Sequence, residues 1–178
     1  MRLSLAGAQN KLPIFIEDGA YHIPEGNLPS SHILKTAIEQ LEDTVTNEAF
    51  CMNLARLVGL PSPEAKVVEI AGKRVYQVER YDRNKGTDGG TTRLHQEDFC
   101  QALGVPPELK YEKEGGPGFA DCFGLVGAWS VEPVLDSLNL LRWALFNFLI
   151  GNADAHAKNL SFLYQTGGVR LAPFYDLL

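Results

Sequence analysis

The alternation of hydrophobic and polar positions divides the chain into a strand-rich first part and a helix-rich second part. Two short apolar runs flank Asp18-Gly19, a dipeptide typical of tight hairpin turns. A second hairpin is predicted to turn at Gly72, and a single strand is expected between the two hairpins. The predicted strands cover residues 12–16, 20–24, 31–37 and the two arms of the hairpin within 65–82.

One helix is expected among these strands. Residues 46–60 carry apolar side chains at helical spacing. Thr46 or Asn47 could cap the start of this helix, and Gly59, followed by a proline, would end it.

The character of the sequence changes after the second hairpin. Residues 83–94 are polar and rich in glycine, which favours a mobile loop or linker. A short helix within 96–105 and another beginning near residue 119 follow. The longest predicted helix covers 133–151, and its second half is apolar on nearly all sides, which predicts burial. A last hairpin is expected within 159–174. This order indicates an α+β chain in two lobes with a cleft between them.

Composition narrows the class of protein. The 178 residues are 45% hydrophobic and carry a formal net charge of −6, which argues against autonomous binding of nucleic acid. The odd number of cysteines and their wide spacing argue against a disulfide framework and a zinc site, so we expect buried thiols and a reducing, cytoplasmic setting. No apolar run suggests a membrane span or a signal peptide. The cysteines are Cys51, Cys100 and Cys122.

Polar side chains gather in the segment GNADAHAKNL, residues 151–160, directly after the apolar helix. Asp154 and Asn159 have the D-x-x-x-x-N spacing in which a carboxylate meets an acceptor hydroxyl and an amide oxygen holds Mg²⁺ during phosphoryl transfer. The last hairpin would return Asp176 beside Asn159 as a second oxygen ligand. Because this spacing alone is common by chance, the hypothesis of a kinase-like site depends on the whole combination.

Lys35 stands among apolar residues on its predicted strand, where it could neutralise nucleotide phosphates, and Glu48 on the following helix could hold it. A lysine facing water and a solvated glutamate are the alternatives. Small residues in segment 4–11 would let backbone N–H groups approach phosphates, although its single glycine makes this signal weak. Backbone groups of residues 78–82 would meet adenine if a nucleotide lies between the lobes; otherwise this stretch is simply a strand end.

His156 could act as a base or as a metal ligand, but its neighbours do not form a zinc set. We favour a structural role in shaping the loop. The other histidines, His22, His32 and His95, share no spacing with it.

Taken together, eight segments resemble those of the HipA-like serine/threonine kinases, the toxin halves of bacterial toxin–antitoxin pairs, in the same order and over nearly the whole chain. The resemblance implies an α+β, two-lobed protein-kinase-like fold, with a strand-rich N-lobe (1–82), a linker or mobile loop (83–94) and a partial helical C-lobe (95–178) that carries a catalytic hairpin. The segments are SLAGAQNK, HILK, TNEAFCMNLARLVGL, VERYDR, RLHQEDFCQALGV, KYEKEGGPG, GNADAHAKN and LAPFYD.

The resemblance also implies roles for individual residues. Asp154 corresponds to the catalytic aspartate, Asn159 and Asp176 to the magnesium ligands, and Lys35 to the lysine that contacts ATP phosphates. Ser4 corresponds to the serine that such kinases autophosphorylate. The remaining residues expected to contact the nucleotide are Leu5, Ala6, Gly7, Ala8, Gln9 and Lys11 of the phosphate loop, Glu79 and Tyr81 of the hinge, and Gln96, His156 and Lys158.

The implied activity is transfer of phosphate from ATP, with Mg²⁺, to a protein of translation, for which an aminoacyl-tRNA synthetase is the expected substrate. A HipB-type antitoxin would be the partner that binds DNA. Typical members begin earlier and continue beyond the position of Asp176, so we expect this chain to be truncated at both ends, with an incomplete C-lobe and exposed apolar surface. A non-catalytic antitoxin-binding or regulatory module and a small-molecule phosphotransferase are the alternatives.

Overall fold

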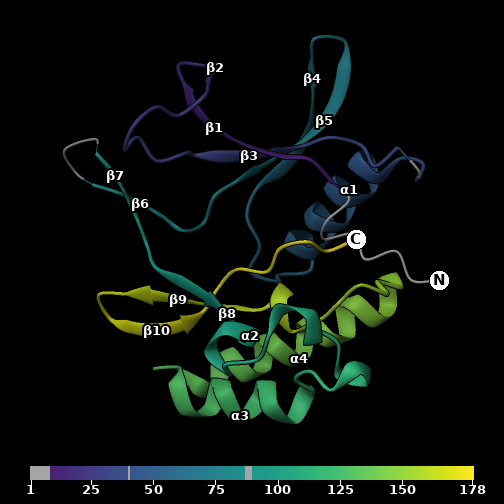
Figure 1. Ribbon diagram of the computed structural model, residues 1–178, viewed down its shortest axis with the longest axis vertical. Helices are drawn as coiled ribbons and strands as arrows, with labels where there is room; N and C mark the ends of the chain where they lie inside the picture. Colours follow the sequence, from purple (N-terminus) through teal and green to yellow (C-terminus); the bar gives the residue numbers. More distant parts are fainter. Residues whose placement is uncertain (1–8, 40, 87–89) are drawn as a thin grey trace.

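A computed structural model describes residues 9–39, 41–86 and 90–178 (Figure 1). The first part forms a five-stranded antiparallel sheet in the order β2-β1-β3-β5-β4, and both predicted hairpins and the single strand between them are confirmed. The strands are β1 (Lys11–Glu17), β2 (Ala20–His22), β3 (His32–Lys35), β4 (Ala65–Ile70) and β5 (Lys73–Glu79).

Helix α1 (Thr44–Leu57) packs against β4 and β5. The prediction that Thr46 or Asn47 caps it was wrong, because the N-cap residue is Asp43, at least three residues earlier, which adopts a left-handed conformation with φ +52°. The Thr46 hydroxyl instead accepts a hydrogen bond of 2.7 Å from Arg74 on β5. The expected end is confirmed, since Gly59 follows the helix with φ +78°.

Within the stretch predicted as a mobile loop or linker, β6 (Arg83–Lys85) pairs with β7 (Thr91–Arg93). A polar pair of strands needs no apolar alternation to pair its backbone, so the sequence pattern did not indicate these strands. The short helix α2 (Phe99–Ala102) begins three residues later than expected, because β8 (Gln96–Asp98) pairs with β9 (Ser161–Gln165). The last predicted hairpin is confirmed by the pairing of β9 with β10 (Gly168–Leu171).

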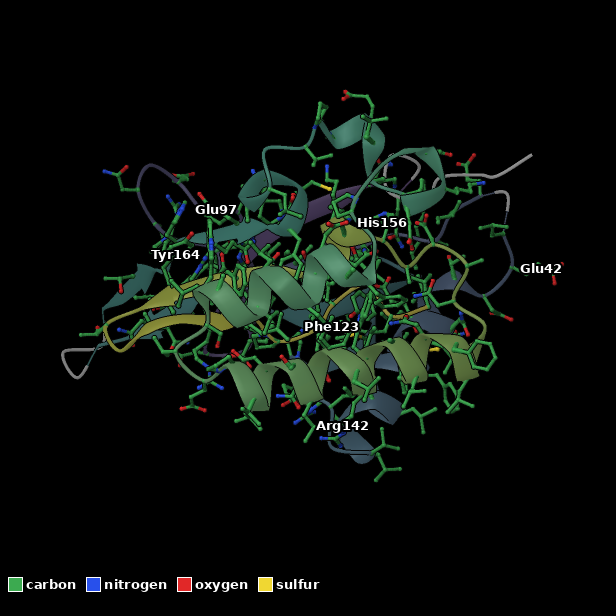
Figure 2. The ribbon with its side chains drawn as sticks, turned by 90° about the horizontal axis from the view of Figure 1, so that it is seen from below. Glu42, Glu97, Phe123, Arg142, His156 and Tyr164 are labelled. Carbon is green, nitrogen blue, oxygen red and sulfur yellow. The ribbon has the colours of Figure 1, made fainter. Side chains whose placement is uncertain are left out.

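Two longer helices form the base of the molecule, α3 (Phe119–Trp129) and α4 (Pro133–Ile150) (Figures 1 and 2). The prediction that the second half of α4 is buried on all sides was wrong, because only one face enters the core, through residues such as Trp143 and Phe146. An incomplete helical lobe is expected to leave such an apolar face uncovered. The exposed apolar residues of α4 are Val134, Leu135, Leu138, Leu141, Leu145, Phe148 and Leu149.

One hydrophobic core connects the sheet to the helices. It runs from Met52 on α1 and Tyr76 on β5, through Phe174 near the end of the chain, to Trp143 on α4. The Phe174 ring stacks on Trp143 with centroids 6.1 Å apart, and its backbone N–H donates to the carbonyl of Pro61 at 2.7 Å. Because a shared core resists separation of its parts, the sheet and the helices hold a fixed cleft between them.

All three cysteines are buried and free, as expected. Within the described ranges, no helix combines the length and the apolar character needed to cross a bilayer.

Candidate functional site

Lys35 lies at the centre of a buried charge cluster. Its ammonium forms ion pairs with the carboxylates of Glu48 on α1 and Asp176 near the chain end, so the predicted pairing of Lys35 with Glu48 is confirmed. Lys35 and Glu48 are 4% and 0% exposed. Burial alone would lower the pKa of Lys35, but the two carboxylates outweigh it and raise the pKa. The lysine is therefore held charged inside the protein.

Asp176 follows the β9–β10 hairpin and adopts a left-handed backbone conformation with φ +53°. Such a conformation is strained for an aspartate and persists only where the surrounding contacts impose it. Here the contacts are two lysines, since Lys11 on β1 lies 3.5 Å from the second carboxylate oxygen. Burial by itself raises the pKa of Asp176. The positive charges of Lys35 and Lys11 lower it by a larger amount, so the pKa of Asp176 lies below the usual value.

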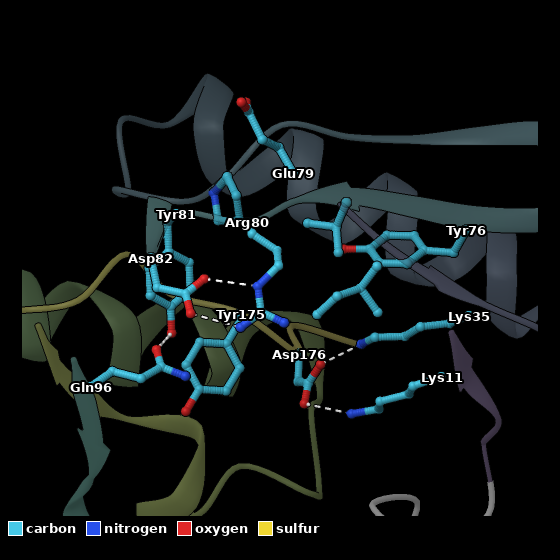
Figure 3. A pocket seen from close by; sticks show the side chains of 13 residues that line it. Lys11, Lys35, Tyr76, Glu79, Arg80, Tyr81, Asp82, Gln96, Tyr175 and Asp176 are labelled. Carbon is cyan, nitrogen blue, oxygen red and sulfur yellow. Dashed lines mark hydrogen bonds and ion pairs between the residues drawn. The ribbon is translucent and has the colours of Figure 1, made fainter. Parts of the chain in front are cut away.

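A cavity of about 190 Å³ opens beside this cluster, between the sheet and the helical part (Figure 3). One end carries Lys35, Lys11 and Asp176, whereas the other end is aromatic. There the rings of Tyr81 and Tyr175 lie near-parallel with centroids 5.9 Å apart. A flat apolar surface next to fixed cations suits a ligand with a planar ring and anionic groups.

The polar contacts of the aromatic end fix its shape. The Tyr81 hydroxyl donates to Gln96 Oε1 at 2.7 Å. The Tyr175 hydroxyl donates to the carbonyl of Lys158 at 2.7 Å and accepts from the Ser161 hydroxyl at 2.6 Å. Burial raises the pKa of Tyr81 and of Tyr175 far above the ordinary phenol value, so both hydroxyls stay protonated and keep donating.

A salt-bridge network behind this wall involves residues that the sequence did not single out. Arg80 lines the cavity and donates to both oxygens of Asp82, from Nε at 3.0 Å and from Nη2 at 2.6 Å. Arg83 approaches the same carboxylate at 2.9 Å and donates to the carbonyl of Ser30 at 2.6 Å. Burial raises the pKa of Asp82, but the two arginines outweigh it and lower the pKa. The alternating charges of VERYDR were the available signal.

The loop that carries Asp154 begins where Gly151 ends α4 with φ +73°. A chain of asparagine contacts shapes it: Asn147 Oδ1 accepts from the side chain of Asn152 at 2.8 Å, and Asn152 Oδ1 accepts from the backbone N–H of Asp154 at 3.0 Å. Further along, Asn159 Oδ1 accepts from the backbone N–H of His156 at 2.9 Å. Side-chain amides therefore replace the helical backbone bonds that end at Gly151.

A second cavity, of about 30 Å³, joins this loop to the charge cluster. It brings together side chains from four separate parts of the chain, and Asp176 lies beside Asn159 as the sequence indicated. The predicted site residues that line it are Gln9, Lys11, Lys35, Asp154, Asn159 and Asp176.

Several expected nucleotide residues lie elsewhere. His156 lines neither cavity that contains Asp176; it is 8% exposed, and both ring nitrogens lack a protein partner. Burial, followed by the nearby Lys110, lowers its pKa, so the ring is neutral. Lys158 also lines neither of those cavities and contributes its backbone carbonyl. Glu79 lines the larger cavity, but its carboxylate points away from it (Figure 3), and its backbone N–H donates to the carbonyl of Glu64 at 3.0 Å.

The expected positions Ser4, Leu5, Ala6, Gly7 and Ala8 lie outside the described residues.

The residues beside the second cavity fit a magnesium ion. Asp176 offers a carboxylate and Asn159 an amide oxygen that keeps one lone pair after accepting from His156. Mg²⁺ prefers oxygen ligands and takes few from the protein when phosphates supply the others. Among the described residues, no group of three or more histidine, cysteine or acidic side chains is placed to hold a metal.

Comparison with known proteins identifies relatives over the whole chain. The family model of the HipA-like C-terminal domain matches residues 3–178. The chain is 51% identical over its full length to Y4mE of Sinorhizobium fredii, which carries the name of a candidate kinase, and 38% identical over 99% of its length to the serine/threonine-protein kinase toxin HipA of Shewanella oneidensis. It spans 42% and 43% of these two relatives, less than half of their length.

Solved structures agree with this assignment. HipA in the complex of Shewanella oneidensis HipA, HipB and operator DNA superposes with a TM-score of 0.84 at 36% identity, covering 99% of this chain and 44% of that one. The Helicobacter pylori kinase CtkA superposes with a TM-score of 0.66 at 15% identity, covering 92% of this chain and 53% of that one, which supports the fold alone. The predicted α+β, two-lobed kinase-like fold is confirmed.

Proposed function

Because the chain belongs to the family of HipA-like C-terminal domains, we propose that it forms the ATP- and magnesium-dependent core of a serine/threonine protein kinase. The observation that carries this proposal is the convergence of Lys35, Asp154, Asn159 and Asp176 on one small cavity, directly beside a larger cavity with an aromatic wall. Phosphoryl transfer depends mainly on positioning and on stabilisation of charge, and these residues supply both.

In the proposed complex, the adenine lies against Tyr81 and Tyr175, with the backbone of the hinge around Glu79 and the amide of Gln96 at its edge. The phosphates point toward Lys35 and Lys11. Both ammonium groups already lie at the carboxylate of Asp176, so neither lysine would have to move far to contact a bound phosphate. The phosphate loop, Leu5 to Lys11, would cover the phosphates from the N-terminal side.

Asp176 and Asn159 would hold the magnesium ion, which supplies neutralisation of charge on the transferred phosphate. Asp154 accepts the proton of the acceptor hydroxyl while the hydroxyl oxygen attacks the γ-phosphorus and ADP leaves. The neutral His156 and the carbonyl of Lys158 act through the shape of the loop, since neither residue lines the cavities that contain Asp176.

The protein substrate and the partner are proposed from the family. A protein of translation, with an aminoacyl-tRNA synthetase as the first candidate, is the proposed substrate, and a HipB-type antitoxin is the proposed DNA-binding partner. We also propose Ser4 as a site of autophosphorylation. A phosphate there carries about −1.5 to −2 charges and would repel ATP phosphates in the same loop.

The test is the thermal stability of the chain with and without Mg-ATP, for the wild type and for Asp176→Asn. At about 100 times the dissociation constant, ligand adds about 2.7 kcal/mol to the free energy of unfolding, which corresponds to a rise of about 5–10 °C in Tm for a chain of this size. A magnesium-dependent rise that Asp176→Asn abolishes is expected. A cooperative transition that Mg-ATP leaves unchanged would favour a non-catalytic, antitoxin-binding module instead.

A further inference from the structure

Tyr111, to which no role has been given above, reaches the proposed catalytic aspartate. Its hydroxyl donates a hydrogen bond to Oδ1 of Asp154, 43 residues further along the chain. Tyr111 belongs to the connection between α2 and α3, so this bond joins that connection to the loop that follows α4. A contact of this kind fixes the direction of a carboxylate that the backbone alone leaves free to rotate.

The ring of Tyr111 is held on two sides. The edge of the ring meets the imidazole of His156 with centroids 5.1 Å apart and planes at 76°. The ammonium of Lys110 lies 4.9 Å from the ring centroid on its face. The backbone N–H of Ala157 donates to the carbonyl of Lys110 at 3.4 Å, which ties the same stretch to the catalytic loop. The position of the hydroxyl is therefore determined by its surroundings.

The backbone around Tyr111 is tightly folded as well. Its carbonyl accepts from the N–H groups of Glu114 and Gly116, both at 3.0 Å. Gly116 approaches so closely that a Cβ atom there would lie 2.0 Å from the carbonyl oxygen of Leu109. This loop is built to one conformation, and that conformation presents the tyrosine hydroxyl to Asp154.

We infer that Tyr111 is a positioning residue for phosphoryl transfer: it holds Oδ1 of Asp154 and thereby directs Oδ2 toward the hydroxyl of the acceptor. The inference rests on the proposed role of Asp154 as the base. Asn152 fixes the backbone of Asp154 and Tyr111 fixes its side chain, so the carboxylate is orientated before any acceptor arrives. A preorientated base avoids the loss in rate that follows a misplacement of about 1 Å.

The same contact has a competing interpretation with the opposite consequence. A hydroxyl that donates to a catalytic carboxylate could occupy the place of the acceptor and block it. Removing that hydroxyl would then accelerate transfer, whereas removing a positioning group slows it. The direction of the change in kcat therefore distinguishes the two.

The experiment compares Tyr111→Phe with Tyr164→Phe, using ATP turnover by the full 178-residue chain. Both changes remove a hydroxyl that donates to a carboxylate, because the Tyr164 hydroxyl donates to Glu97 at 2.7 Å. Tyr164 and Glu97 lie together, apart from His156 and the catalytic loop (Figure 2). Tyr111→Phe is expected to lower kcat by about 10–100-fold with KM for ATP within about twofold of wild type, and Tyr164→Phe to leave both unchanged. An unchanged or increased kcat for Tyr111→Phe would overturn the inference.

A second measurement does not require activity. The ¹³Cγ resonance of Asp154, assigned by its loss in Asp154→Asn, is recorded at one pH for the three proteins. Tyr111→Phe is expected to displace or broaden it, and Tyr164→Phe to leave it in place. If the wild type turns over no ATP, the proposed function fails while this resonance still decides the role of Tyr111. A resonance that Tyr111→Phe leaves unmoved would refute the positioning role whatever the activity.

Discussion

The ammonium of Lys35 is paired with the carboxylate of Asp176, although 141 residues separate them in the sequence. This pair connects the central strand of the sheet to the segment that follows the last hairpin. Together with Glu48 and Lys11 this pair forms a cluster of two lysines and two carboxylates, of which Lys11, Lys35 and Asp176 line the larger cavity and Glu48 lies buried behind Lys35. A bound polyanion such as a nucleotide phosphate would therefore add negative charge to a cluster whose lysines are already in place.

Two replacements of Lys35 should show that its effect on the free energy of unfolding is distinct from its effect on nucleotide binding. Lys35→Met leaves Glu48 buried without its cation, so the free energy of unfolding should fall by about 3–5 kcal/mol. The double variant Lys35→Met/Glu48→Leu removes the buried charge of Glu48 and should regain part of this loss, because a well-packed apolar pair replaces an ion pair at little cost, whereas the partly exposed Asp176 keeps Lys11 as its only cation of this cluster. Both should lose the Mg-ATP-dependent rise in Tm. Urea unfolding and thermal shift measure the two effects.

The control for this pair is Lys66→Met, on the exposed part of β4. It should change the free energy of unfolding by no more than about 0.5 kcal/mol. Normal Mg-ATP binding by the double variant would show that Lys35 does not contact the phosphates.

Replacement of the two aspartates of the site should affect phosphate transfer and Mg-ATP binding differently. Asp154→Asn removes the proton acceptor but leaves the charge cluster intact, so phosphate transfer should fall by about 10²–10⁴-fold while the Mg-ATP-dependent rise in Tm is retained. Asp176→Asn removes the proposed metal ligand, so both transfer and the rise should be lost. Transfer is followed by the intact mass of the chain after incubation with ATP. Full activity in either variant would contradict the role given to that residue.

Asp136 should make stability depend on acid pH. This buried carboxylate accepts from Arg170 at 3.0 Å, from Ser130 at 2.6 Å and from the backbone of Leu171 at 2.9 Å. Burial raises its pKa, but these donors, led by Arg170, outweigh burial and lower the pKa below its value of about 3.9 in the unfolded chain. The folded state thus binds this proton more weakly, and the contribution is complete above about pH 5 and lost as the pH falls further.

Asp136→Asn should consequently lower the free energy of unfolding by about 1–3 kcal/mol at pH 7, because the donors from Arg170, Ser130 and Leu171 lose a charged acceptor while Arg170 keeps its ion pair with Glu132 at 2.9 Å. The difference from wild type should shrink toward pH 3, because the unfolded chain takes up a proton on this carboxylate that the native state binds more weakly. Urea titrations at the two pH values provide the measurement. A difference that is the same at both would rule out this carboxylate as the source.

Gly116 offers a test of the loop that carries Tyr111. Gly116→Ala places a Cβ atom against backbone, at 2.0 Å from the Leu109 carbonyl oxygen, so the loop must open and the Tyr111 contact with Asp154 should weaken. We expect a loss of about 1–3 kcal/mol and a reduced kcat. Gly127→Ala on α3 meets no atom within 4 Å and should stabilise the helix by about 0.5–1 kcal/mol without affecting turnover.

The sequence predicted the strands of the five-stranded sheet, the last hairpin and the main helices, because hydrophobic periodicity is a local signal. The hairpins at Asp18-Gly19 and Gly72 and the end of α1 at Gly59 depend on residues within a few positions of each other. The pairing of Lys35 with Glu48 could also be predicted, because the two residues lie on a strand and on the helix that directly follows it in the sequence. The start of α1 was not, because a left-handed Asp43 carries no side-chain cap that a pattern would reveal.

The contacts missed by the sequence are those that tertiary packing creates. Nothing in the spacing of Tyr111 and Asp154 indicates that they touch, and the position of Arg80 against Asp82 depends on how the chain turns after β5. The exposed apolar face of α4 has the same origin, since periodicity reports which residues are apolar and not which of them find neighbours. Local patterns therefore located the segments of the site, and the geometry that joins them required the structure.

The long separation between Lys35 and Asp176 also sets an order of events during synthesis on the ribosome. The sheet and α1 can pair Lys35 with Glu48 as soon as both have emerged, but the carboxylate of Asp176 is added more than a hundred residues later. At about 5–20 residues per second, the growing chain spends several seconds with Lys35 in place and its second carboxylate partner missing. The proposed nucleotide site thus comes into existence only as translation passes the last hairpin, so a nascent chain would be inert until then.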